Sequence, residues 1–127
     1  MKVKTGIDII ETKRIQDSIN KFGDNFINRI FTQKEIEYCN SKKTQKVQSY
    51  AARFAAKEAV FKALSELLED KYDIEWKDIE IINNEQGRPY VILNGKLKEV
   101  VSAIQEIDIS ISHIAEYAMA SCVVTFK

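Results

Sequence analysis

Two carboxylates, Asp8 and Glu58, lie in apolar segments of the chain. Asp8 stands in a strand-like segment of alternating isoleucines, and Glu58 lies in a run rich in alanine and phenylalanine. A buried carboxylate is costly unless it pairs with a cation or binds a metal ion. Two hard oxygen ligands that leave room for water and phosphate suit Mg²⁺, and Mn²⁺ accepts the same ligands. The alternative is that each carboxylate pairs with a nearby Lys or Arg.

Three cations accompany Glu58 in the run from Ala51 to Leu64, namely Arg53, Lys57 and Lys62. At helical spacing this run is apolar on two sides, which predicts a helix that is buried on both. Cations beside a bound metal would stabilise a polyphosphate. Glu58 and Lys62 are also four residues apart, the spacing of an ordinary ion pair on a helix surface.

Other candidate groups lie outside this run, and each has a simpler structural explanation. The only histidine follows a serine in Ser112-His113, where it can donate to a phosphate or serve as a structural residue at a strand end. Gly87-Arg88-Pro89 would bring backbone and one charge close to a ligand, or form a hairpin turn. Glu35 would act as a general base, or complete a capping box with Thr32.

Hydrophobic patterning predicts five strands and one long helix. Residues alternate in the strand segments, which are Val3–Ile9, Ile79–Ile82, Tyr90–Leu93, Ile107–Ile111 and Tyr117–Phe126. The long helix is expected from Ser49 to Leu68, after a polar loop at residues 42–48. The expected fold class is α+β, with an antiparallel sheet packed against the long central helix.

Shorter helices are expected before and after these elements. The first has apolar residues at Ile15, Ile19 and Phe22, with Gly23 as its C-terminal cap. Asp24 would cap a second helix, and the capping box at Thr32 would open a third. Helical spacing is also found at Leu97, Val100, Val101 and Ile104. Neither a repeat nor a linker interrupts the chain, so residues 1–127 are expected to form a single domain.

Composition restricts the class of partner. The 127 residues are 45% hydrophobic and 30% charged, with a formal net charge of zero, so the totals indicate neither nucleic acid nor membrane. Basic residues gather early in the chain and would suit an acidic partner; they are Lys13, Arg14, Lys21 and Arg29.

Cys39 and Cys122 lack CxxC spacing, which favours a reduced protein, and we expect a cytoplasmic location without a signal peptide or membrane span.

Several segments together resemble a known family. They are Gly6-Ile7-Asp8 followed by Arg14, Phe31–Glu35, Ala51–Ala59, Gly87–Pro89 and Ser110–His113. In this order they resemble the holo-acyl-carrier-protein synthase family of small bacterial 4′-phosphopantetheinyl transferases, over nearly the whole chain. The resemblance implies the transferase fold and the transfer of phosphopantetheine from coenzyme A to a serine of apo acyl carrier protein, with release of adenosine 3′,5′-bisphosphate.

The resemblance also implies roles for particular residues. Asp8 and Glu58 would hold Mg²⁺ against the pyrophosphate, Lys62 would neutralise developing charge, and Glu35 would order or deprotonate the serine. The residues expected to lie beside coenzyme A are Arg53, Lys57, Lys62, Gly87, Arg88, Pro89, Ser112 and His113. The expected docking residues for the acidic carrier protein are Lys13, Arg14, Lys21 and Arg29. The family further implies a homotrimer with active sites between subunits.

Three other functions stay open from the residues alone. A Mg²⁺-dependent phosphohydrolase acting on coenzyme A or a nucleotide would use the same carboxylates. A non-catalytic module would bind an acidic protein or RNA through the basic helix faces, although the first helix offers few aromatic residues for stacking. A structural oligomerisation domain would use the alanine-rich face to pack subunits together.

Overall fold

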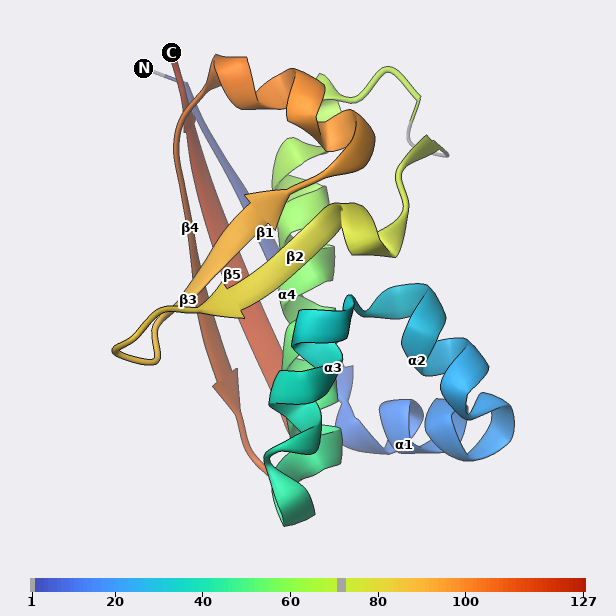
Figure 1. Cartoon of the computed structure of the whole chain (residues 1–127). Helices are drawn as coiled ribbons and strands as arrows, with labels where there is room; N and C mark the ends of the chain where they lie inside the picture. Colours follow the sequence, from blue (N-terminus) through green and yellow to red (C-terminus); the bar gives the residue numbers. More distant parts are fainter. Residues whose placement is uncertain (1, 71–72) are drawn as a thin grey trace.

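Helix α4 (Lys46–Leu64) runs along one face of an antiparallel sheet with the strand order β1-β5-β4 (Figure 1). This computed structural model describes residues 2–70 and 73–127. The strands of this sheet are β1 (Lys2–Glu11), β4 (Ile104–His113) and β5 (Tyr117–Phe126). Two further strands, β2 (Ile79–Asn83) and β3 (Pro89–Leu93), pair with each other in a separate antiparallel sheet. The α+β prediction and its five strand segments are confirmed, but the strands form two sheets in the described part of the chain.

Small residues allow α4 to lie close to β1 and β5. The helix buries Ala55, Ala56, Ala59 and Ala63, and β5 turns Ala118, Ala120 and Cys122 toward it. On β1, a β-carbon at Gly6 would lie 1.9 Å from the carbonyl oxygen of Ala59. Only glycine permits this approach, so the contact between Gly6 and Ala59 sets the distance between β1 and α4.

Three short helices follow β1, of which the first and the third pack against α4 and the second packs against the first (Figure 1). They are α1 (Thr12–Phe22), α2 (Asp24–Ile30) and α3 (Gln33–Asn40). Gly23 ends α1 with φ +56° and donates its N–H to Ile19, which confirms the predicted cap. The predicted capping box is also present, because Glu35 N–H donates to the Thr32 hydroxyl and Thr32 N–H donates to the Glu35 carboxylate.

The ends of several elements differ from the sequence prediction. Helix α4 begins at Lys46, inside the expected loop, and ends at Leu64 because the Ser65 hydroxyl caps the Lys62 carbonyl and a 3₁₀ turn follows. Gly95–Ala103 is 3₁₀ rather than α-helical, and its glycine and two adjacent valines have low α-helix propensity. Asp24 is the first residue of α2 and makes no capping bond.

In the described part of the chain, no helix combines the length and the hydropathy needed to cross a bilayer.

Candidate active site

Asp8 and Glu58 line the same cavity, as the magnesium hypothesis requires. Alternation along β1 turns Asp8 toward α4, where its side chain is 17% exposed. Glu58 projects from α4 and is partly buried. The cavity has a volume of about 250 Å³, and its other walls come from β1, α1, α2 and α4, through Ile9, Ile10, Arg14, Ile15, Ser18, Phe26 and Phe54.

The two carboxylates repel each other electrostatically. Burial raises the pKa of the Glu58 carboxyl, the charge of Asp8 raises it further, and Lys62 opposes both effects. A divalent cation would relieve this repulsion, so the donor set fits Mg²⁺ or Mn²⁺. Within residues 2–70 and 73–127 no cluster of three or more His, Cys, Asp or Glu residues offers a metal site, so other ligands would come from water or phosphate.

Lys62 lies beside this pair of carboxylates. Its ammonium group donates to the carbonyl oxygen of Ile7 at 2.9 Å and lies 3.4 Å from a carboxylate oxygen of Asp8. The side chain remains half-exposed, so the charge is accessible to a ligand. The ion pair described for Lys62 is therefore with Asp8, on the neighbouring strand, instead of the helix-surface pair with Glu58.

Substituting Glu58 by glutamine is expected to raise the Tm of the metal-free protein at pH 7 by about 1–3 °C. The folded pKa of Glu58 lies above its ordinary value of 4.5, so ionisation of this carboxyl lowers stability as pH rises through the raised pKa. The glutamine variant lacks this loss. Thermal unfolding of the variant and the wild type at pH 7 and at a pH well below 4.5 checks the sign. The difference in Tm between the two proteins should vanish at the lower pH. An unchanged or lower Tm at pH 7 would contradict the repulsion.

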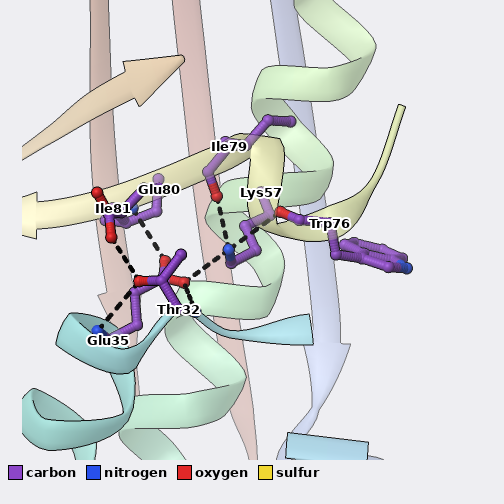
Figure 2. Close-up of polar contacts among 7 residues, drawn as sticks. All are labelled: Thr32, Glu35, Lys57, Trp76, Ile79, Glu80 and Ile81. Carbon is purple, nitrogen blue, oxygen red and sulfur yellow. Dashed lines mark hydrogen bonds and ion pairs between the residues drawn. The ribbon is translucent and has the colours of Figure 1, made fainter. Parts of the chain in front are cut away.

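Glu35 and Lys57 form an ion pair in the interior, away from solvent (Figure 2). The Lys57 ammonium lies 2.7 Å from the Glu35 carboxylate, and both side chains are 0% exposed. Burial lowers the pKa of Lys57, and the charge of Glu35 opposes this shift. The sequence-based hypothesis gave Glu35 to the attacking serine and Lys57 to a coenzyme phosphate. In the single chain both groups are buried and paired with each other, and their roles toward the serine and the phosphate stay predictions.

Arg53 is also buried, at 4% exposure. Its guanidinium donates to the side-chain oxygen of Asn83 at the end of β2 and lies over the Tyr38 ring, 3.8 Å from the ring centre. These contacts join α4 to the β2–β3 hairpin and to α3. In the single chain the Arg53 guanidinium therefore faces protein groups, and its contact with a coenzyme phosphate stays a prediction.

The remaining residues expected at coenzyme A lie near β4. Gly87 has φ +84° in the turn between β2 and β3, and exposed Arg88 makes two hydrogen bonds, of 2.9 and 3.0 Å, with the Asp108 carboxylate. His113 Nδ1 lies 3.1 Å from the side-chain oxygen of Gln48. Ser112 points to the opposite face of the sheet from His113, since neighbouring strand residues alternate.

Within one chain, the predicted metal ligands and the predicted coenzyme residues near β4 therefore lie at opposite edges of the sheet. Asp8, Glu58 and Lys62 lie at the β1 edge, whereas residues 87–89 and 112–113 lie at the β4 edge. Strand β5 and the core against α4 separate the two groups (Figure 1). The structure thus unites the predicted metal ligands with Lys62 but leaves residues 87–89 and 112–113 apart from them.

The predicted docking residues form an exposed basic surface beside the cavity. Lys13, Arg14 and Lys21 lie on α1, and Arg29 lies on α2. Arg14 lines the same cavity as Asp8. Lys13 pairs with Asp17 at 3.2 Å, and the Lys21 ammonium lies over the Phe22 ring, so both keep their charges at the surface.

Sequence reasoning missed six residues that line the cavity, which are Ile9, Ile10, Ile15, Ser18, Phe26 and Phe54. Ser18 follows Arg14 by four residues, and Phe54 precedes Glu58 by four, so helical spacing was an available signal. Phe54 also stacks on Trp76, with ring centres 4.8 Å apart. That stacking depends on tertiary contact, which spacing does not predict.

Comparison with known proteins identifies relatives over almost the full chain. The model of the 4′-phosphopantetheinyl transferase superfamily matches residues 4–122. The "Holo-[acyl-carrier-protein] synthase" of Koribacter versatilis is 42% identical over 125 residues, covering 97% of this chain and 98% of the relative. That of Ruminiclostridium cellulolyticum is 44% identical over 127 residues, covering 98% and 93%. The Helicobacter pylori holo-[acyl-carrier-protein] synthase, solved in complex with coenzyme A, has a TM-score of 0.80 and 33% identity, covering 95% of this chain and 99% of that one.

Proposed function

The chain belongs to the 4′-phosphopantetheinyl transferase superfamily, and from this premise we infer that it is a holo-acyl-carrier-protein synthase. It transfers 4′-phosphopantetheine from coenzyme A to a serine of apo acyl carrier protein. A bond forms between the serine oxygen and the phosphorus that carries pantetheine. The pyrophosphate bond breaks, and adenosine 3′,5′-bisphosphate leaves. The observation that carries this assignment within the structure is the shared cavity of Asp8 and Glu58, with Lys62 at its rim.

Asp8 and Glu58 would hold Mg²⁺ or Mn²⁺ at this cavity, where the ion would neutralise charge on the pyrophosphate oxygens. Lys62 would place its half-exposed ammonium against the same group, since its second partner is only a backbone carbonyl. Phosphoryl transfer depends mainly on positioning and charge stabilisation. The two carboxylates and one lysine supply both without a covalent step on the protein.

The carrier protein would dock on the basic surface of α1 and α2. Arg14 joins this surface to the catalytic cavity, because it is exposed and also lines the cavity wall. An acidic carrier bound to Lys13 and Lys21 would bring its serine toward Asp8 along α1. The clustered charge accelerates encounter as well as binding.

The active site would be completed by a second copy of the chain in a homotrimer. The cavity of about 250 Å³ lies below the range of about 300–1,000 Å³ that is typical for a ligand pocket. Coenzyme A would therefore extend beyond it, and the residues at the β4 edge of a neighbouring subunit would supply the missing contacts. The sheet face that α4 leaves uncovered is apolar and exposed, through Val3, Ile7, Ile9, Met119 and Val123.

Substituting Ile7 by aspartate is expected to convert the trimer to monomers, because a charge in the apolar centre of an interface is costly. Ile7 is 61% exposed in the single chain, so the folded monomer should tolerate the change. Light scattering should give a mass three times 14.6 kDa for the wild type and 14.6 kDa for the variant. Val101→Asp, at a 48% exposed valine away from this face, is the control. A wild-type monomer, or a trimeric Ile7→Asp protein, would refute the interface.

We also propose a cytoplasmic location. Cys39 and Cys122 are free and buried, and burial raises their pKa values to about 11 and about 12. Two unpaired thiols are usual in a reducing compartment.

Product analysis separates this function from a phosphohydrolase. Coenzyme A should be consumed only when apo acyl carrier protein is present, with one adenosine 3′,5′-bisphosphate released for each carrier modified. Chromatography of the nucleotides, with and without carrier, gives the answer. Consumption of coenzyme A without carrier would identify a hydrolase instead.

A further inference from the structure

The ion pair between Glu35 and Lys57 lies in the interior among α3, α4 and β2 (Figure 2). Each charged group has all its partners inside the protein. The Lys57 ammonium donates to the carbonyl oxygens of Ile79 at 2.6 Å and Trp76 at 3.2 Å, in addition to the Glu35 carboxylate at 2.7 Å. Three donors therefore meet three acceptors, and Lys57 keeps no capacity for a ligand.

The Glu35 carboxylate is equally occupied. One oxygen accepts from Thr32 N–H at 2.8 Å and faces Lys57, and the other accepts from Ile81 N–H at 2.9 Å. The Thr32 hydroxyl extends the network to the Glu80 carboxylate at 2.5 Å. The pair thus joins the start of α3, the middle of α4 and the backbone of β2, segments that are 22 or more residues apart in the sequence.

We propose that the Glu35–Lys57 pair is a positioning device that fixes the rotation of α4, so that Glu58 faces Asp8 across the metal cavity. The proposal rests on the proposed function, because it concerns the metal ligands of that reaction. Lys57 immediately precedes Glu58, and neighbouring residues on a helix point about 100° apart. Anchoring the Lys57 ammonium at three fixed acceptors therefore also fixes the direction of Glu58.

The geometry explains why a charged pair occupies this position. Apolar residues of similar volume often stabilise a core as well as a buried ion pair does, so stability alone does not require a charged pair here. The Lys57 site accepts the ammonium in one position only, because two of its acceptors are backbone carbonyls, that of Ile79 at the start of β2 and that of Trp76 in the 3₁₀ turn before it. Gly6 sets the distance between β1 and α4, and the ion pair sets the rotation of α4 relative to β2 and α3.

Glu35→Gln tests the proposal, with Glu37→Gln as the matched control on the exposed face of the same helix. The amide of glutamine brings a donor where the carboxylate had only acceptors. In either orientation it therefore opposes Ile81 N–H, or Lys57 and Thr32 N–H. We expect Mn²⁺ binding in the presence of coenzyme A, followed by electron paramagnetic resonance, to weaken about tenfold. The Mn²⁺ concentration for half-maximal rate should rise equally, with kcat at saturating Mn²⁺ within about threefold of the wild type.

Two other results would overturn the positioning role. Unchanged Mn²⁺ affinity with a lower Tm would mean that the pair serves stability alone. Unchanged Mn²⁺ affinity with a large loss of kcat would return Glu35 to the chemical step. If Glu35→Gln does not fold, Glu35→Asp carries the same test, since it keeps the charge but shortens the reach to Lys57. Failure of the wild type itself to bind Mn²⁺ with coenzyme A would instead refute the proposed function.

Discussion

Replacing Asp8 by alanine is expected to lower the rate of carrier modification by about 10²-fold or more, the scale of losing one preorganised charge stabiliser. Asp8 and Glu58 are the two carboxylates of the cavity, so one of them alone would hold Mg²⁺ poorly. The fold should survive, because Asp8 lies at the rim and its removal relieves the repulsion that raises the pKa of Glu58. Initial rates at saturating coenzyme A and Mg²⁺, beside a thermal unfolding curve, measure both effects.

A control separates this loss from a general effect of charge. Glu66→Ala removes another carboxylate, one that is paired with Lys4 at 2.8 Å on the surface. It should leave both the rate and the Tm close to the wild type, as isolated surface pairs contribute little. An Asp8→Ala protein that is folded and fully active would refute the metal assignment.

Substituting Gly6 by alanine is expected to reduce both stability and rate. The added methyl group would lie 1.9 Å from the carbonyl oxygen of Ala59 and 2.8 Å from the backbone nitrogen of Ala63. Backbone atoms within a helix do not move aside cheaply, so β1 must shift away from α4. Overpacking of this kind costs about 1–3 kcal/mol of unfolding free energy. Asp8, two residues along β1, would shift with the strand.

The rate of the Gly6→Ala variant is therefore expected to fall by at least about tenfold, because small misplacements of catalytic groups are expensive. Urea unfolding and initial rates, both measured at 15–20 °C below the variant's own Tm, separate misplacement from simple unfolding. Lys2→Ala, an exposed change on the same strand, is the control. A Gly6→Ala protein with wild-type stability and rate would show that α4 and β1 have freedom that the structure denies them.

Local signals in the sequence predicted the elements that carry the metal ligands. Alternation around Asp8 and the two-sided apolar run around Glu58 each depend on neighbouring residues, and both elements form as expected. The capping box at Thr32 is equally local. The shared cavity also requires β1 to pack beside α4, and the close contact at Gly6 explains that packing.

The roles of the buried cations could not be predicted in this way. Lys57 finds its partners on Glu35, Trp76 and Ile79, all at least 19 residues away, and Arg53 finds Asn83 in the β2–β3 hairpin. Helical spacing placed both residues beside Glu58 but did not indicate which side chains would cover them. The division of the strands into two sheets is likewise a tertiary property, because pairing partners are not encoded in alternation.

The most direct test of the account is the intact mass of an apo acyl carrier protein after incubation with this protein, coenzyme A and Mg²⁺. We predict a gain of one phosphopantetheine unit on a single serine, abolished by a chelator and nearly absent with the Asp8→Ala variant. An unchanged carrier mass with several apo carriers, while the protein is folded and Mg²⁺ is present, would contradict the transferase assignment.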